Sequence, residues 1–97
     1  MLIDSGPNPP DSHVVMKAVR QLTAQPVRFL INTETHHDHT SGNFVFSPPA
    51  LVIAAQGATQ GIKGYFDPKR NEKLIAELAE MREAYRGFRL VTPHVEF

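Results

Sequence analysis

Apolar residues occur along the chain in short runs that are separated by prolines, glycines and polar segments. Three of these runs, Met1–Ile3, Val27–Asn32 and Ala50–Ala55, predict β-strands, and Phe88–Val91 is a further strand candidate. The run Val27–Asn32 is rich in β-branched and aromatic residues and apolar on both faces, as in an interior strand of a parallel sheet.

Two segments place apolar residues at helical spacing. The first helix is predicted to begin at Asp11 or Ser12, either of which can cap its first turn, and to end near Ala24, before Pro26. Its expected buried stripe consists of Val15, Ala18, Val19 and Leu22.

The second helix is predicted from Asn71 to about Arg86, with Gly87 as its C-cap. Its expected buried stripe is Leu74, Ile75, Leu78, Met81 and Tyr85. Its charged residues lie largely elsewhere on the helix and predict a solvated face: Glu72, Lys73, Glu77, Glu80 and Glu83.

The order strand–helix–strand–loop–strand–helix–strand predicts an α/β protein with a mostly parallel or mixed sheet and right-handed crossovers. No proline- or glycine-rich stretch is long enough to be a linker, so we expect one domain over residues 1–97. The glycine-rich segment Gly57–Gly64 lacks the Gly-Lys-Ser/Thr end of a P-loop. The nearby cations Lys63, Lys69 and Arg70 are expected in a solvated loop.

Composition narrows the functional classes. The chain of 97 residues has no cysteine, which excludes a disulfide scaffold, a thiolate zinc knuckle and a thiol nucleophile. Ten Lys and Arg balance ten Asp and Glu, and the absence of net charge argues against a nucleic-acid partner. There is no membrane-spanning apolar run and no secretory signal, so we expect a cytoplasmic protein without a membrane partner.

The polar segment Thr33–Asn43 follows the strand Val27–Asn32 directly and concentrates possible metal ligands. Glu34, His36, Asp38 and His39 supply four within six positions. They lie just beyond the carboxyl end of a buried strand, where open α/β sheets place their sites. Imidazole and carboxylate donors together suit Zn²⁺, Fe²⁺ or Mn²⁺. Glu34 and His36 can share one ion, and Asp38 and His39 can serve a second. The alternative is a solvated polar loop with no ligand.

This segment resembles the motif of the metallo-β-lactamase-fold metallohydrolases, a strand followed by His-x-His-x-Asp-His and then Gly-Asn. The match runs from Ile31 to Asn43, with Glu34 in place of the first histidine. Upstream, Leu2–Gly6 resembles the family's earlier strand ending in Asp-Thr-Gly. The resemblance implies half of the family's αββα sandwich, a truncated domain with a mixed sheet and flanking helices.

By the same resemblance, His36 is a first-site ligand beside Glu34, and Asp38 and His39 hold a second metal. Asp38 also has a catalytic role, orienting the attacking metal-bound water, and Asp4 supports the site without being a ligand. The implied function is metal-dependent hydrolysis of a small-molecule substrate with one or two zinc ions, iron or manganese being possible. The carboxylate of Glu34 is a harder ligand than imidazole and favours iron or manganese.

The family takes further ligands, two histidines and a bridging aspartate, from a second half that this chain lacks. The alternative function is therefore a non-catalytic half-domain that binds metal weakly or acts as a structural, oligomerising module. A half-sandwich leaves one apolar sheet face uncovered, which predicts a homo-oligomer such as a homodimer. The remaining histidines, His13, His37 and His94, are not expected to be ligands.

Overall fold

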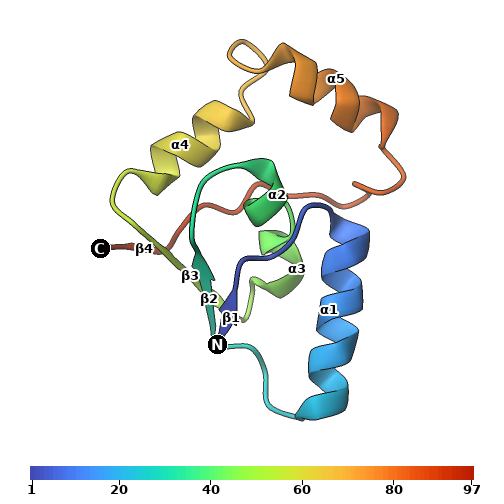
Figure 1. Cartoon of the computed structure of the whole chain (residues 1–97), viewed down its shortest axis with the longest axis vertical. Helices are drawn as coiled ribbons and strands as arrows, with labels where there is room; N and C mark the ends of the chain where they lie inside the picture. Colours follow the sequence, from blue (N-terminus) through green and yellow to red (C-terminus); the bar gives the residue numbers. More distant parts are fainter.

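Four short parallel strands form the centre of the structure, a computed structural model that describes all residues from Met1 to Phe97 (Figure 1). Their spatial order follows the chain: β1 (Leu2–Ile3), β2 (Phe29–Asn32), β3 (Leu51–Ala54) and β4 (Val95–Glu96). The register pairs Ile3 with Ile31, Ile31 with Ile53, and Ile53 with Val95.

Helices carry every connection between neighbouring strands. The first contains α1 (Pro9–Leu22), the second α2 (His37–Thr40) and α3 (Asn43–Phe46), and the third α4 (Ala58–Tyr65) and α5 (Glu72–Glu80). The predicted α/β class is confirmed. The expected mixed sheet is wrong, because each helical crossover returns the chain in the same direction and all three strand pairs are parallel. None of the helices is both long and apolar enough to cross a membrane.

The core lies between one face of the sheet and helices α1 and α3. Leu30 and Val52 from neighbouring positions of β2 and β3 are fully buried against Phe46 of α3, and Ala50 completes this cluster. Met16 of α1 and Val45 of α3 pack around it. Strands β2 and β3 are thus interior strands, as predicted for their apolar runs.

The opposite face of the sheet is uncovered. Its exposed apolar residues include Ile3 (59% exposed), Phe29 (44%), Leu51 (46%) and Val95 (47%). The strand register places them on one surface with the half-buried Ile31 and Ile53. We call these six residues the open sheet face. The molecule is accordingly thin, with principal extents of 41 × 33 × 16 Å.

Helix α1 begins earlier than predicted. Asn8, not Asp11 or Ser12, is its N-cap, and the Asn8 side chain accepts a hydrogen bond from the backbone N–H of Asp11 at 2.9 Å. Two prolines follow the cap, where the helix requires no N–H donor. The predicted buried stripe is also wrong, since Val15 is 39% exposed and Leu22 87% exposed. The helix instead turns Ser12, Met16 and Val19 toward the protein.

The region after β3 departs most from the predictions. Helix α4 occupies the glycine-rich segment for which no helix was predicted. Helix α5 begins after Asn71 as predicted but ends at Glu80, and turns then lead to Gly87, whose φ is +76°. Of its predicted stripe, only Leu74 and Tyr85 are buried and Met81 is exposed, whereas the five charged residues are exposed as predicted.

The last strand is Val95–Glu96, and the predicted strand Phe88–Val91 is wrong. Phe88 packs instead among the rings of Phe44, Phe66 and Tyr85. The Glu96 carboxylate accepts hydrogen bonds from the backbone N–H groups of Gly57 (3.3 Å) and Thr59 (2.6 Å) at the start of α4. These bonds lower the pKa of Glu96, that from Thr59 having the largest effect.

Candidate metal centre

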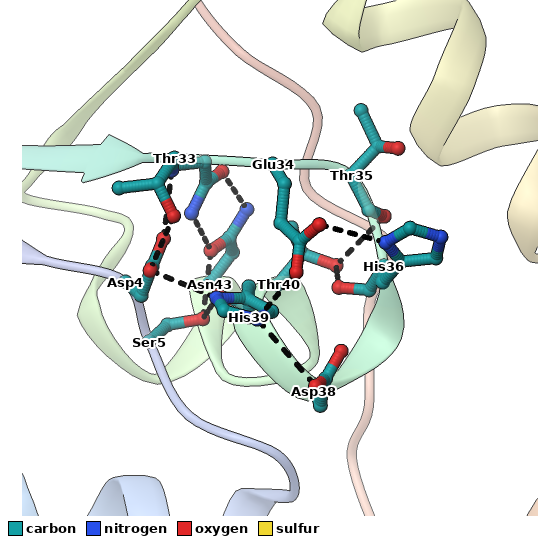
Figure 2. Close-up of polar contacts among 11 residues, drawn as sticks. Asp4, Ser5, Thr33, Glu34, Thr35, His36, Asp38, His39, Thr40 and Asn43 are labelled. Carbon is teal, nitrogen blue, oxygen red and sulfur yellow. Dashed lines mark hydrogen bonds and ion pairs between the residues drawn. The ribbon is translucent and has the colours of Figure 1, made fainter.

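The predicted ligands gather at the carboxyl edge of the sheet, beyond the ends of β1 and β2 (Figure 2). Glu34 lies on the loop after β2, and its side chain extends toward α2. Asp38 and His39 project from α2, and Asp4 approaches from the segment after β1. The pairing of β1 with β2 therefore brings together residues that are up to 35 positions apart in the chain.

Three side chains can hold one metal ion together. One ligand atom each from Glu34, Asp38 and His39 lies within 4.8 Å of the others. Nε2 of His39 is 3.4 Å from Oδ2 of Asp38 and 2.5 Å from Oε1 of Glu34. The three side chains are between about one third and one half exposed, so an ion can reach them from solvent.

These distances fit a tetrahedral divalent ion with small adjustments. Bond lengths of about 2.0–2.2 Å place the ligand atoms of a tetrahedral zinc site roughly 3.3–3.6 Å apart. The separation between His39 and Asp38 already has this value. Glu34 would need to withdraw by about 1 Å from His39, a movement within reach of a long, half-exposed side chain.

Asp4 fixes the orientation of the His39 ring. Nδ1 of His39 lies 2.9 Å from Oδ2 of Asp4, so the Nδ1–H group donates a hydrogen bond to the carboxylate. This bond turns Nε2 toward Glu34 and Asp38. Metal-binding histidines almost always donate their second ring N–H to such a partner, which is a carboxylate, a backbone carbonyl or a water. Asp4 adopts a left-handed backbone conformation with φ +57°, which is uncommon outside glycine and marks a position under constraint.

Asp4 and His39 shift each other's pKa. The hydrogen bond to Asp4 is the main cause of a raised pKa of His39; burial opposes this shift, and the charges of Asp38, Asp4 and Glu34 add to it. Burial works to raise the pKa of Asp4, but hydrogen bonds from the Thr33 hydroxyl (2.6 Å), His39 and the Thr33 N–H (2.8 Å) together hold it below its ordinary value. Asp4 therefore remains an anion beside His39.

His36 joins the centre through Glu34. Its Nδ1 lies 2.9 Å from Oε2 of Glu34, the oxygen that does not face His39. Its ring points away from His39 in Figure 2, and His36 is outside the group of three converging ligand atoms. The structure thus brings together Glu34, Asp38 and His39, while His36 contacts one of them.

A buried amide network supports this edge of the sheet from below. Asn43 exchanges two hydrogen bonds with Asn32 (2.8 and 3.0 Å), and its Oδ1 accepts a third from Ser5 Oγ at 2.8 Å. Its Nδ2 also donates to the backbone oxygen of Val91 at 3.0 Å. These residues were not predicted to support the site, although Asn32, Gly42 and Asn43 stand within or beside the motif.

Gly42 is required by close packing rather than by an unusual turn. Its φ is −91°, which any residue can adopt. A Cβ atom at Gly42 would lie 2.3 Å from the backbone oxygen of Ser5 and less than 2 Å from Ser12 Oγ. The missing side chain therefore lets α3 approach the segment after β1, which carries Asp4.

The other histidines are outside the group of ligands. His37 stacks on Tyr65, with ring centroids 5.7 Å apart. His94 is exposed, and its Nδ1 accepts a hydrogen bond from the backbone N–H of Val52 at 2.9 Å, which ties β4 to β3. His13 is exposed on α1, as expected.

Comparison with known proteins assigns no family. No protein-family model matches the chain, and no curated protein sequence matches it.

Proposed function

We propose that the chain binds a divalent metal ion through Glu34, His36, Asp38 and His39. The convergence of Glu34, Asp38 and His39 carries this proposal, together with the Asp4 carboxylate on the far nitrogen of His39. His36 is the fourth ligand, and it reaches the ion by exchanging its bond with Glu34 for a bond to the metal. One imidazole–carboxylate centre of this kind suits Zn²⁺, with Fe²⁺ or Mn²⁺ as alternatives, and the motif allows a second ion.

We further propose that the protein is a metal-dependent hydrolase related to the metallo-β-lactamase superfamily, with half of the family's sandwich. A bound ion would polarise the substrate and supply an activated water at neutral pH. Asp38 is both a ligand and the catalytic residue of this chain, because one oxygen of its half-exposed carboxylate can bind the ion while the other orients the attacking water. Asp4 holds His39 in the tautomer that presents Nε2.

A cavity beside Glu34 can receive a small substrate. It has a volume of about 330 Å³ and lies between the segments that follow β2 and β3. Thr33 and Thr35 line one wall, and Gln56 and Gly57 line the other. The volume is in the range of small-molecule sites, and the lining offers hydroxyl and amide groups for polar substrates.

Metal analysis of the purified protein tests this function. We expect near-stoichiometric zinc, iron or manganese in the wild type and loss of the metal in the Glu34→Ala/His36→Ala double variant. Turnover of a chromogenic β-lactam or a thioester by the metal-loaded wild type would show hydrolysis. Absence of bound metal would contradict the proposal, whereas bound metal without turnover would favour a non-catalytic metal-binding module.

The open sheet face favours a second, compatible role as an oligomerising module. Its six residues are all apolar, so the face carries no charge that would oppose contact with a second copy. Exposed apolar surfaces of this kind mark interaction sites, and a two-fold pair can bury the same patch from both subunits. We therefore propose a homodimer that buries the two sheets face to face.

A further inference from the structure

One face of α4 connects the protein core to residues 33–36, the segment between β2 and α2 that we call the ligand loop. Ala58, Gly61, Ile62 and Tyr65 follow one another at the spacing that places residues on a single side of a helix. Ala58 and Ile62 are buried and anchor the helix. Gly61 and Tyr65 contact the segment that carries Glu34 and His36. An element without any ligand of its own therefore packs against the candidate metal centre.

Tyr65 lies between two histidines of the motif. Its ring meets that of His36 edge to face, with centroids 5.0 Å apart and an interplanar angle of 87°. It stacks on His37 with centroids 5.7 Å apart and an angle of 18°, and its hydroxyl lies 3.4 Å from His37 Nδ1. The half-buried Tyr65 therefore restricts the rotation of the His36 ring, whose Nδ1 contacts Glu34.

Gly61 holds the residue before His36 at van der Waals distance. A Cβ atom at Gly61 would lie 2.8 Å from Cγ2 of Thr35, so the helix backbone packs directly on that side chain. Thr35 separates Glu34 from His36 in the chain. The two contacts from α4 therefore restrain both the Thr35 side chain and the ring of His36.

We propose that Tyr65 is a positioning residue that keeps the His36 ring beside Glu34, where the ring can exchange this hydrogen bond for a bond to the metal. This inference rests on the proposed metal site. The His36 side chain is 54% exposed, so without Tyr65 it has room to rotate into solvent. The rotational freedom of the ring would then have to be lost when the metal binds, which lowers the affinity for metal. Removal of groups that orient metal ligands typically lowers metal affinity by about 10- to 100-fold.

Zinc titration of the metal-stripped full chain tests this role with three variants. Tyr65→Leu removes the ring, and we expect about tenfold weaker binding. Tyr65→Phe keeps the ring and removes only a long contact to His37, so we expect wild-type affinity. Phe88→Leu is the matched control, since Phe88 packs against Phe44, Phe66 and Tyr85 and contacts no histidine.

A double-mutant cycle separates positioning from a general effect on folding. If Tyr65 acts through His36, Tyr65→Leu has no further effect on zinc affinity in a His36→Ala background. An equal loss in both backgrounds would overturn the proposal, as would wild-type affinity of the Tyr65→Leu protein.

The NMR shift of the His36 ring protons in the metal-free protein gives a readout that does not depend on metal. Tyr65→Leu should move these signals toward the values of a freely rotating histidine, and Tyr65→Phe should leave them in place. Unchanged signals in Tyr65→Leu would overturn the proposal. A wild type that binds no zinc but shows these shifts would refute the proposed function alone.

Discussion

Asp4 decides which nitrogen of His39 is available at the candidate metal centre. Its carboxylate accepts hydrogen bonds from His39 Nδ1 and from the backbone N–H and the hydroxyl of Thr33. A single residue therefore joins the end of β1, the loop after β2 and helix α2. Replacing the carboxylate by an amide of the same shape therefore tests the site without creating a cavity.

The substitution Asp4→Asn should lower zinc affinity by about 10- to 100-fold, because the His39 ring loses the anion that fixes its tautomer. Asparagine tolerates the left-handed backbone found at this position, so the fold should persist. Calorimetric titration measures the effect. The surface variant Glu83→Gln, at a side chain that is 82% exposed, is the control and should bind like the wild type. Equal affinity of both variants would contradict this role of Asp4.

The pH dependence follows from the raised pKa of His39. Protons and metal compete for Nε2, so zinc affinity should fall as the pH drops through this raised pKa. In the metal-free protein, the ion pair with Asp4 stabilises the fold below the ordinary histidine pKa of 6.5, and this contribution is lost as the pH rises through the raised value.

Asp4→Asn should move the affinity midpoint to lower pH, because it removes the main cause of the shift. Zinc titrations across a pH series measure both midpoints. An unchanged midpoint in the variant would contradict the assignment.

For individual residues, the sequence predicts the metal ligands better than it predicts the residues that hydrogen-bond to them. Glu34, Asp38 and His39 stand close together after a strand, so their grouping follows from local geometry. The bond from Asp4 to His39 spans 35 positions and depends on the pairing of β1 with β2, which no local pattern contains. Only the family resemblance pointed to Asp4.

Helix α4 connects the core, the carboxyl terminus and the ligand loop. Glu96 binds the backbone N–H groups at its start, while Gly61 and Tyr65 contact the loop near its end. The low pKa of Glu96 means that this link stabilises the fold above the ordinary glutamate pKa of 4.5 and is lost as the pH falls through the lowered value. Helix α4 therefore stabilises the candidate site although its residues lie outside the motif.

The substitution Gly61→Ala should destabilise the fold by about 1–3 kcal/mol, since the added methyl group meets Thr35. An alanine ordinarily stabilises a helix relative to glycine, so the sign of the effect is diagnostic. Urea denaturation measures it. Gly57→Ala is not a suitable control because of its positive φ, whereas Ala79→Gly reports the ordinary helix effect at an exposed position of α5. Stabilisation by Gly61→Ala would contradict the close packing.

Elements with a strong apolar pattern were predicted well, and those shaped by tertiary packing were not. Strands β2 and β3 lie within one or two residues of their predicted bounds, because interior strands require continuous apolar runs. Helix α4 was not predicted, because Gly61 and Gly64 within it are unfavourable for a helix. Gly61 is nevertheless needed where the helix packs against Thr35. Strand β4 is a two-residue pairing that no pattern of this length can specify.

The whole molecule is one sheet with α1 and α3 packed against one of its faces. The core cluster fills the covered face, and the open sheet face has no protein layer over it. A thin molecule of 16 Å in its shortest extent can close this face by pairing with a second copy. The proposed homodimer belongs to this scale.

The substitution Leu51→Lys tests the dimer, because it places a charge on the open sheet face at a side chain that is 46% exposed. We expect the wild type to sediment as a dimer and the variant as a folded monomer. Leu22→Lys on α1, where the side chain is 87% exposed and does not belong to the open sheet face, should remain dimeric. A monomeric wild type would contradict the proposal.

The most direct test of the metal centre is calorimetric titration of zinc into the metal-stripped protein and two single variants. We predict about one tightly bound equivalent or more in the wild type, with the tight site lost in Asp38→Ala and in His39→Ala. Asp67→Asn, an acidic residue outside the group of ligands, should bind like the wild type. Absence of binding by the wild type, or unchanged binding by His39→Ala, would contradict the proposed site.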